Sequence, residues 1–212
     1  MARITKGILG GFRGKVGNVV GSSIFGIDVM RSYQPDVSNP RTEAQTTQRQ
    51  KFSLMIDFIR QGLYIYQVGF SLAAVKMSAY NYAFSCNFFN AITGTFPNFT
   101  IDPTKIKVSQ GHLPGTLGAY LEAVDLNELS ITKDDNSDVF GASADDIFNV
   151  LVVNSTTGKI LPVVNAGTRS QTEVFINGIG GDVGDVFTAY WFYSKADGTA
   201  ISDQAFESKT LT

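Results

Sequence analysis

Residues 187–194 read FTAYWFYS, an aromatic segment that contains the only tryptophan of the chain. In an extended strand successive side chains point to opposite faces, so Tyr190 and Phe192 share one face and Trp191 and Tyr193 share the other. One pair is expected to fill a core between two sheets. For the other pair three interpretations stay open: a partner contact, a platform for carbohydrate, or a layer beneath helices. Trp191 with Tyr193 is the candidate surface pair.

Six other short β-rich runs lie between Gly94 and the C-terminus, and turn residues separate them. They cover residues 106–109, 129–132, 149–154, 160–165, 172–176 and 200–206. Residues 155–158 and 196–199 have the composition of hairpin loops. Seven short strands at this spacing predict an antiparallel β-sandwich of immunoglobulin-like plan over residues 94–212.

Residues 38–93 have the pattern of helices. Thr42-Glu43-Ala44-Gln45 fits a capping box, in which the Thr42 hydroxyl accepts a hydrogen bond from the amide of Gln45 and the Gln45 side chain reaches back. Apolar residues then follow at helical spacing until Gly62, which is expected to end or kink the first helix. A second helix is predicted over about 71–92. Its aromatic residues occur on more than one face, so this helix is buried or covered by a partner.

Residues 1–37 form a glycine-rich arm that also contains many Val and Ile residues. Val and Ile favour strands, and glycines suit tight turns or the close approach of another backbone. We expect an antiparallel hairpin in which residues 15–22 pair with 27–34. Because a two-stranded hairpin is marginal in water by itself, the arm must lie on the chain's own helices or on a neighbouring subunit. The expected contact residues are Phe12, Arg13, Lys15, Val20, Ile24, Phe25, Met30 and Arg31.

The predicted fold is therefore α+β and mainly β, with an N-terminal β-hairpin arm at 1–37, two helices within 38–93 and a C-terminal sandwich at 94–212. The chain has 212 residues, 43% of them hydrophobic, which is enough for one sizeable core or two modest ones. No apolar stretch is long enough to span a membrane, and glycines interrupt the region where a signal peptide needs a continuous apolar run. We expect a soluble protein, synthesised in the cytoplasm, without a membrane partner.

Charge is distributed unevenly along the chain. The net charge is -2, with 17 Lys and Arg residues against 19 Asp and Glu, which gives no general electrostatic reason to bind nucleic acid or an anionic membrane. The N-terminal quarter is nevertheless basic, because Asp28, Asp36 and Glu43 only partly offset its Lys and Arg residues. Two interpretations stay open. This region tracks a phosphate backbone, or it meets an acidic surface such as the sandwich of a neighbouring copy.

The reactive side chains form no familiar catalytic motif. His112, the only histidine, lies in the loop-like segment 111–115, and neither GxSxG nor HExxH occurs. We therefore expect no catalytic residues and no cofactor, and we interpret the chain as a non-catalytic building block. Cys86 is the only cysteine, so an intrachain disulfide is excluded, and its apolar neighbours predict a buried, inert thiol.

Two loops resemble ligand-binding motifs. Residues 134–138 with Asp145 have the spacing of a calcium loop, but Val139 replaces the required glycine and the flanks look like strands. A solvated acidic loop is therefore favoured over a metal site. Residues 177–185 are glycine-rich like a phosphate-binding loop, but a strand-like segment follows where a phosphate cradle needs a helix. A loop between strands is the favoured interpretation.

Several short stretches carry a resemblance to other proteins. They read KGILGGF at 6–12, GKVG at 14–17, VGS at 20–22, GIDVMRS at 26–32, NAITG at 90–94, PNF at 97–99 and SKADG at 194–198. With these residues the chain resembles a family of unknown function found in Bacteroidota. The resemblance implies an organism class and an architecture, but no catalytic or binding residues. The segment NPRTEAQ at 39–45 is similar to a helix opening in uncharacterised phage-encoded proteins, which implies a virion or a similar assembly.

These observations predict a structural, non-catalytic subunit that self-associates or decorates a larger assembly, such as a phage particle or filament. Its expected partners are further copies of the chain or other structural proteins, and its expected location is the virion or assembled particle if it is phage-encoded. The alternatives are a β-sandwich binding module for a glycan or peptide, and a nucleic-acid-binding protein that uses the basic arm.

Overall fold

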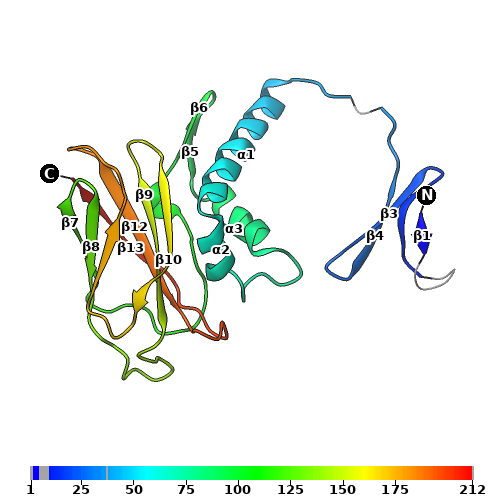
Figure 1. Ribbon diagram of the computed structural model, residues 1–212. Coiled ribbons are helices and arrows are strands. Elements are labelled where there is room, and N and C mark those ends of the chain that lie inside the picture. Colours follow the sequence, from blue (N-terminus) through cyan, green and yellow to red (C-terminus); the bar gives the residue numbers. More distant parts are fainter. Residues whose placement is uncertain (1, 5–9, 37, 212) are drawn as a thin grey trace. The chain divides into compact units, whose positions relative to one another are not determined.

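The computed structural model describes residues 2–4, 10–36 and 38–211, and the chain divides into two compact units, Met1–Thr46 and Thr47–Thr212 (Figure 1). We call the first unit the arm and the second unit the body. Residues 6–9, which open the stretch that resembles the family of unknown function, lie outside the described residues. The same holds for Val37, the last residue of the predicted arm.

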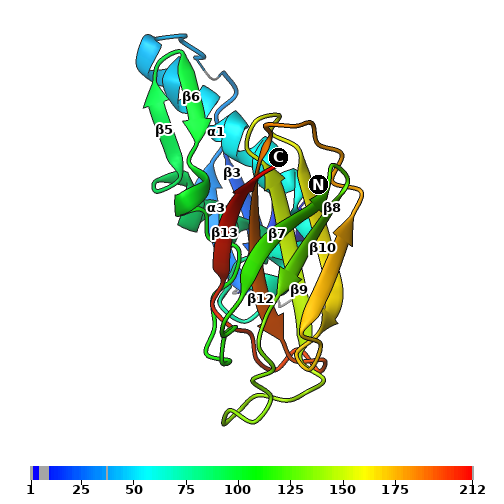
Figure 2. The same ribbon diagram turned by 90° about the vertical axis from the view of Figure 1, so that its left-hand side faces the viewer.

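The body contains two antiparallel sheets that lie face to face (Figure 2). One has the strand order β10-β9-β12-β13 and the other the order β11-β8-β7. The strands are β7 (Tyr120–Asp125), β8 (Glu128–Thr132), β9 (Ile147–Asn154), β10 (Ile160–Thr168), β11 (Glu173–Asn177), β12 (Val186–Ser194) and β13 (Ala205–Thr210). Buried residues from both sheets, among them Leu121, Leu129, Val150 and Trp191, form one hydrophobic cluster. An antiparallel β-sandwich is therefore present.

Strand β12 separates this cluster from a second one. Tyr190 and Phe192 pack into a cluster that includes helix residues, whereas Trp191 and Tyr193 pack inside the sandwich. Trp191 is 2% exposed and Tyr193 is 0% exposed, so the prediction that they form a surface pair is wrong. The reason is that the helices cover the outer face of the four-stranded sheet. Both faces of β12 are consequently buried, and the side-chain alternation expected from the sequence is present.

Within the described residues there are three α-helices rather than the two expected: α1 (Glu43–Gln61), α2 (Leu63–Gly69) and α3 (Ala79–Phe88). The Thr42 hydroxyl accepts from the Gln45 amide at 3.4 Å, as the capping box predicts, and α1 ends just before Gly62. The predicted second helix over 71–92 is wrong in its bounds. A β-carbon at Gly69 would stand 2.2 Å from the carbonyl oxygen of Val108, so the backbone packs closely where α2 ends.

A new helix begins after this break, at an N-cap residue of its own. The Ser78 hydroxyl accepts from the Asn81 amide at 3.2 Å and begins α3. Cys86 on α3 is only partly buried, so the expectation of a fully buried thiol is wrong. It flanks the buried positions Ala83 and Asn87, which face the core. None of the helices among the described residues is long and apolar enough to cross a lipid bilayer.

Two further predicted strands are wrong. Residues 106–109 run as an irregular segment, in which Ile106 and Val108 still fill the core, and the Asn87 carboxamide accepts from the Lys107 amide at 2.7 Å. Of the predicted strand 200–206, only the end belongs to β13. The structure adds strand β7, a hairpin of β5 (Ile92–Thr95) with β6 (Asn98–Ile101), and the 3₁₀ turn η1 (Pro103–Lys105).

The arm is a four-stranded antiparallel sheet in the order β1-β2-β3-β4. Its strands are β1 (Arg3–Ile4), β2 (Phe12–Val16), β3 (Val19–Ile24) and β4 (Ile27–Ser32). The prediction of a single hairpin, 15–22 with 27–34, is therefore wrong in extent, although β3 and β4 do form a hairpin. Gly17, with φ of 57°, makes a turn that separates β2 from β3. That turn assigns Lys15 and Val16 to β2.

Candidate functional site

The register of the arm sheet sorts its side chains into two faces. Val20 pairs with both Lys15 and Arg31, and directly paired residues in an antiparallel sheet point to the same face. Arg13 lies two residues before Lys15 on β2 and therefore points the same way, as does Arg3, which pairs with Arg13. This face carries every Lys and Arg residue of the four strands, and we call it the basic face.

The basic face carries aliphatic side chains beside its positively charged ones. Its aliphatic residues are Val20, Ile24, Ile27 and Val29. The Lys15 ammonium lies 3.3 Å from the centroid of the Tyr33 ring. Among the residues that the structure describes, none of the four basic side chains forms an ion pair with a carboxylate. Four positive charges on one small sheet face favour a negatively charged partner.

The opposite face of the arm sheet is mixed: it carries Phe12 and Met30 but also Asp28, and it contains two paired glycines. The Phe12 ring covers Gly21, where a β-carbon would stand 2.8 Å from the ring atoms, and Gly21 pairs with Gly14. Met30 on β4 is 68% exposed. The expected contact residues therefore do not share one surface. Arg13, Lys15, Val20, Ile24 and Arg31 lie on the basic face, Phe12 and Met30 lie on the opposite face, and Phe25 lies in the β3–β4 turn.

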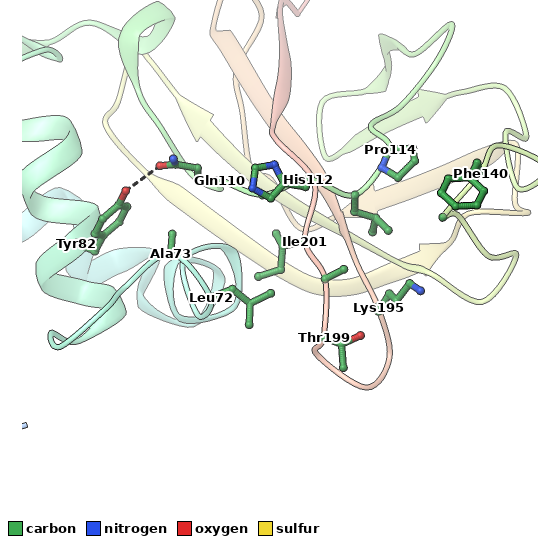
Figure 3. Close-up of a pocket in the computed structure, with 14 residues that line it drawn as sticks. Leu72, Ala73, Tyr82, Gln110, His112, Pro114, Phe140, Lys195, Thr199 and Ile201 are labelled. Atoms are coloured by element: carbon green, nitrogen blue, oxygen red, sulfur yellow. Dashed lines mark hydrogen bonds between the residues drawn. The ribbon is translucent and has the colours of Figure 1, made fainter.

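A pocket of about 580 Å³ opens in the body between the end of α2, the segment 110–114 and the loop 195–201 (Figure 3). Leu72, Ala73 and Ile201 supply apolar walls. The Tyr82 hydroxyl donates a hydrogen bond of 2.9 Å to the Gln110 side-chain oxygen at one side of the pocket. The pocket therefore combines apolar walls with a few polar groups, as ligand pockets commonly do.

His112 lines this pocket, in the loop that the sequence indicates. The lining includes Lys195 and Thr199, but no Asp, Glu, Ser or Cys is present among the described residues that line it. A histidine without an orienting carboxylate or an adjacent nucleophile is poorly placed for general base or nucleophilic catalysis.

The acidic loop at 134–138 shows loop hydrogen bonding. Asp135 accepts from the Ser137 amide at 3.0 Å, and hydrogen bonding by Ser137 lowers the pKa of that carboxyl. Asp145, at the twelfth position of the calcium-like spacing, is exposed. In the part of the chain that the structure describes, no group of three or more His, Cys, Asp or Glu side chains is arranged to hold a metal ion.

The glycine-rich segment 177–185 connects β11 to β12, so the prediction of a loop between strands is confirmed. Asp185 at its end accepts from the Asn154 side chain at 2.8 Å and from the Asp182 amide at 3.2 Å. These hydrogen bonds lower the pKa of the Asp185 carboxyl, led by the bond from Asn154. A carboxylate inside the loop opposes the binding of phosphate, because like charges repel.

A buried ionic network lies at one end of the sandwich, and the sequence analysis missed it. Arg169, which is 0% exposed, contacts the Asp146 carboxylate through Nε at 2.9 Å. It donates to the Asn136 side chain at 2.7 Å and to the Pro114 carbonyl at 2.8 Å. Its guanidinium lies 3.8 Å from the centroid of the Tyr193 ring. These partners are 23, 33 and 55 positions away along the chain, so no local motif announces them.

Lys133 is buried beside this network. Its ammonium donates to the carbonyl oxygens of Thr168 at 3.1 Å and Arg169 at 2.8 Å, and also to that of Gln171. Burial lowers the pKa of Lys133 to about 8; the Asp135 carboxylate raises it, and the charge of Arg169 lowers it again. A protonated lysine held in this position therefore costs stability relative to a neutral one.

The stability of the body is expected to rise with pH above about 8, as Lys133 loses its proton. The lysine pKa is lower in the folded chain than its ordinary value of 10.5, so the unfolded chain binds more protons in this interval. Urea unfolding at several pH values, from neutral to about 9.5, measures the slope. Lys133→Met should remove this contribution, whereas Lys159→Met, at an exposed position, should keep it. A difference between wild type and Lys133→Met that stays constant with pH would contradict the assignment.

A family model described as a family of unknown function, DUF6266, matches residues 11–207. No curated protein matches the chain in sequence. The fn3 domain of the human collagen alpha-1(XX) chain is 7% identical, with a TM-score of 0.38, over 49% of this chain and 90% of that domain. The fn3 domain of human contactin 1 is 8% identical, with a TM-score of 0.32, over 49% and 83%.

Proposed function

The chain belongs to this family of unknown function, and from that premise we propose that it is a structural, non-catalytic subunit that self-associates or decorates a larger assembly. In this proposal the body, an immunoglobulin-like sandwich backed by helices, provides the bulk of the subunit. The arm provides the joint to other polypeptides. A phage particle or filament is the kind of assembly proposed.

The observation that carries the proposal is the construction of the arm. Its four strands form a single-layer sheet, and within residues 1–46 no second layer is described that could cover either face. Ile24 is 62% exposed on the basic face and Met30 is 68% exposed on the opposite face. Ordering the backbone costs about 1–2 kcal/mol of conformational entropy per residue. A sheet without a core of its own offsets this cost only when its apolar side chains are buried against another surface.

The edge strand β4 supports the same conclusion. All six of its residues are exposed, and β4 is the terminal strand of the arm sheet, with no further strand paired to it among the described residues. An open edge presents unpaired backbone N–H and C=O groups to any neighbouring strand. Arm sheets of this kind are suited to adding a strand or a face from another chain.

Removing residues 1–37 is expected to convert an associating protein into a single-chain particle. The deletion keeps Thr42 as the helix cap, and both hydrophobic clusters of the body lie between Met55 and Leu211, so the body retains its core. Light scattering after size exclusion, over a range of concentrations, should give multiples of 23.0 kDa for the full chain. The truncated chain should give the mass of one copy. A full-length chain that stays at one copy throughout this range would contradict the proposal.

A binding module is the second candidate, because the pocket beside His112 has a volume of about 580 Å³. This candidate would be favoured if the full chain stayed monomeric and if glycan or peptide affinity survived the deletion of residues 1–37.

Nucleic-acid binding, the other alternative, would depend on the positive charges of the basic face. If fluorescent DNA bound the full chain with strong salt dependence and binding disappeared in the Arg13→Glu/Lys15→Glu variant, the basic face would be a nucleic-acid surface.

A further inference from the structure

The outer face of the three-stranded sheet in the body is acidic and partly aromatic. The register aligns two neighbouring rows across β7, β8 and β11: Tyr120, Thr132 and Glu173, then Glu122, Ser130 and Phe175. The alternate residues Leu121, Ile131 and Val174 are buried in the sandwich, so these two rows point away from that core, and of their residues Ser130 is only 1% exposed. The three strands contain no Lys or Arg. We call this surface the acidic face.

In the part of the body that the structure describes, no helix covers the acidic face. Helices lie against the other sheet of the sandwich, on the far side from β7 and β8 (Figure 1). Glu122 and Glu173 are exposed, and neither forms an ion pair among the described residues. Tyr120 is 45% exposed and Phe175 is 51% exposed. The face therefore offers unpaired negative charge together with apolar area, which is the chemical complement of the basic face of the arm.

The charged pairs on the two faces have the same spacing. Arg13 lies on β2 and Arg31 lies on β4, two strands away. Along the strand direction they are offset by two residues, because Arg31 shares its row with Lys15, which follows Arg13 by two residues. Glu122 and Glu173 also lie two strands apart and are offset by two residues. Strands about 4.8 Å apart with a rise of about 3.4 Å per residue place each pair about 12 Å apart. Two arginines can therefore meet two glutamates at once.

We propose, on the basis of the proposed function, that the basic face of the arm docks on the acidic face of a second copy of this chain. Arg13 and Arg31 pair with Glu122 and Glu173, and the aliphatic residues of the arm pack against Tyr120 and Phe175. Charge favours this partner: residues 1–46 contain six Lys and Arg against three Asp and Glu, whereas residues 47–212 contain 11 against 16. Opposite potentials on two faces of one chain favour association of copies.

The proposed contact joins two different surfaces, so it is heterologous. In an assembly that does not close, the copy at one end keeps a free arm and the copy at the other end keeps a free acidic face. Contacts of this type produce rings when the rotation closes and open filaments when it does not. The docked arm also gains the second layer that residues 1–46 do not supply themselves.

Charge exchange tests this pairing in the full chain. Arg13→Glu/Arg31→Glu reverses the arm, and Glu122→Arg/Glu173→Arg reverses the acidic face. Each double variant alone should raise the concentration at which half the chains associate by about tenfold or more, because like charges then face each other. An equimolar mixture should restore association to nearly the wild-type level. In that mixture the reversed arm meets the reversed face, and the unaltered arm meets the unaltered face.

A matched control makes the same change of charge as the acidic-face variant, but at a different place in the body. Asp138 and Asp145 are exposed in the loop between β8 and β9, and Asp138→Arg/Asp145→Arg should associate like wild type. Sedimentation velocity measures association, and far-ultraviolet circular dichroism checks that each variant is folded. If the acidic-face variant associated like wild type while the arm variant did not, this pairing would be wrong and the proposed function would stand. A monomeric wild type would overturn the proposed function itself.

Discussion

Replacing Arg169 with methionine is expected to lower the free energy of unfolding of the body by about 3–5 kcal/mol. Arg169 is 0% exposed and Asp146 is 2% exposed in side-chain area, so the substitution leaves a buried carboxylate without its cation. It also removes the donors that satisfy Asn136 and the Pro114 carbonyl. For a domain of this size the loss corresponds to a fall in the melting temperature of about 6–20 °C.

Two comparisons separate the loss of the ion pair from a general effect of the substitution. Arg60→Met removes an exposed arginine on α1 and should change stability by less than about 0.5 kcal/mol. The double variant Arg169→Met/Asp146→Leu removes both charges, so it should recover part of the loss, because no unpaired charge remains buried. Chemical denaturation measures all three. An Arg169→Met variant within about 1 kcal/mol of wild type would show that the network is not structural.

The sandwich and its alternating strands follow from local patterns in the sequence. The aromatic run at 187–194 predicts a strand with two apolar faces, and β12 (Val186–Ser194) has them. The glycine-rich loop before it and the helix cap at Thr42 depend on neighbouring residues alone, and both are confirmed. These features are local, which is why periodicity and turn residues suffice to find them.

Features that depend on distant contacts were not predictable in the same way. Trp191 and Tyr193 face the sandwich and not solvent, because helices far earlier in the chain cover the opposite face of β12. The irregular segment around Val108 has the composition of a strand, but side chains of Asn87 and Gln204 take its backbone amides. Strand β7 has mixed polarity because one face is the exposed acidic face, so its pattern resembles a loop.

The contact residues expected in the arm divide for a related reason. The sequence predicts contact residues between Phe12 and Arg31 because the arm cannot be stable by itself. The register then separates them, since Phe12 and Met30 lie opposite Arg13 and Arg31. A turn at Gly17 decides this register, and its position determines which residues of β2 and β3 share a face. The acidic face depends on the pairing of β11 with β8, which β9 and β10 separate in the sequence.

Chemical cross-linking in a mixture of ¹⁴N-labelled and ¹⁵N-labelled chains tests most directly whether the arm joins one chain to another. Lys15 is on the basic face, beside Arg13, and a carbodiimide links a lysine amine directly to a contacting carboxylate. We expect Lys15 to be linked to Glu122 or Glu173 in an equimolar mixture of ¹⁴N and ¹⁵N chains. The linked peptides should combine the two isotopes in the statistical proportion. Links from Lys15 that always join peptides of the same isotope would show that the arm lies on its own chain, and would contradict the account.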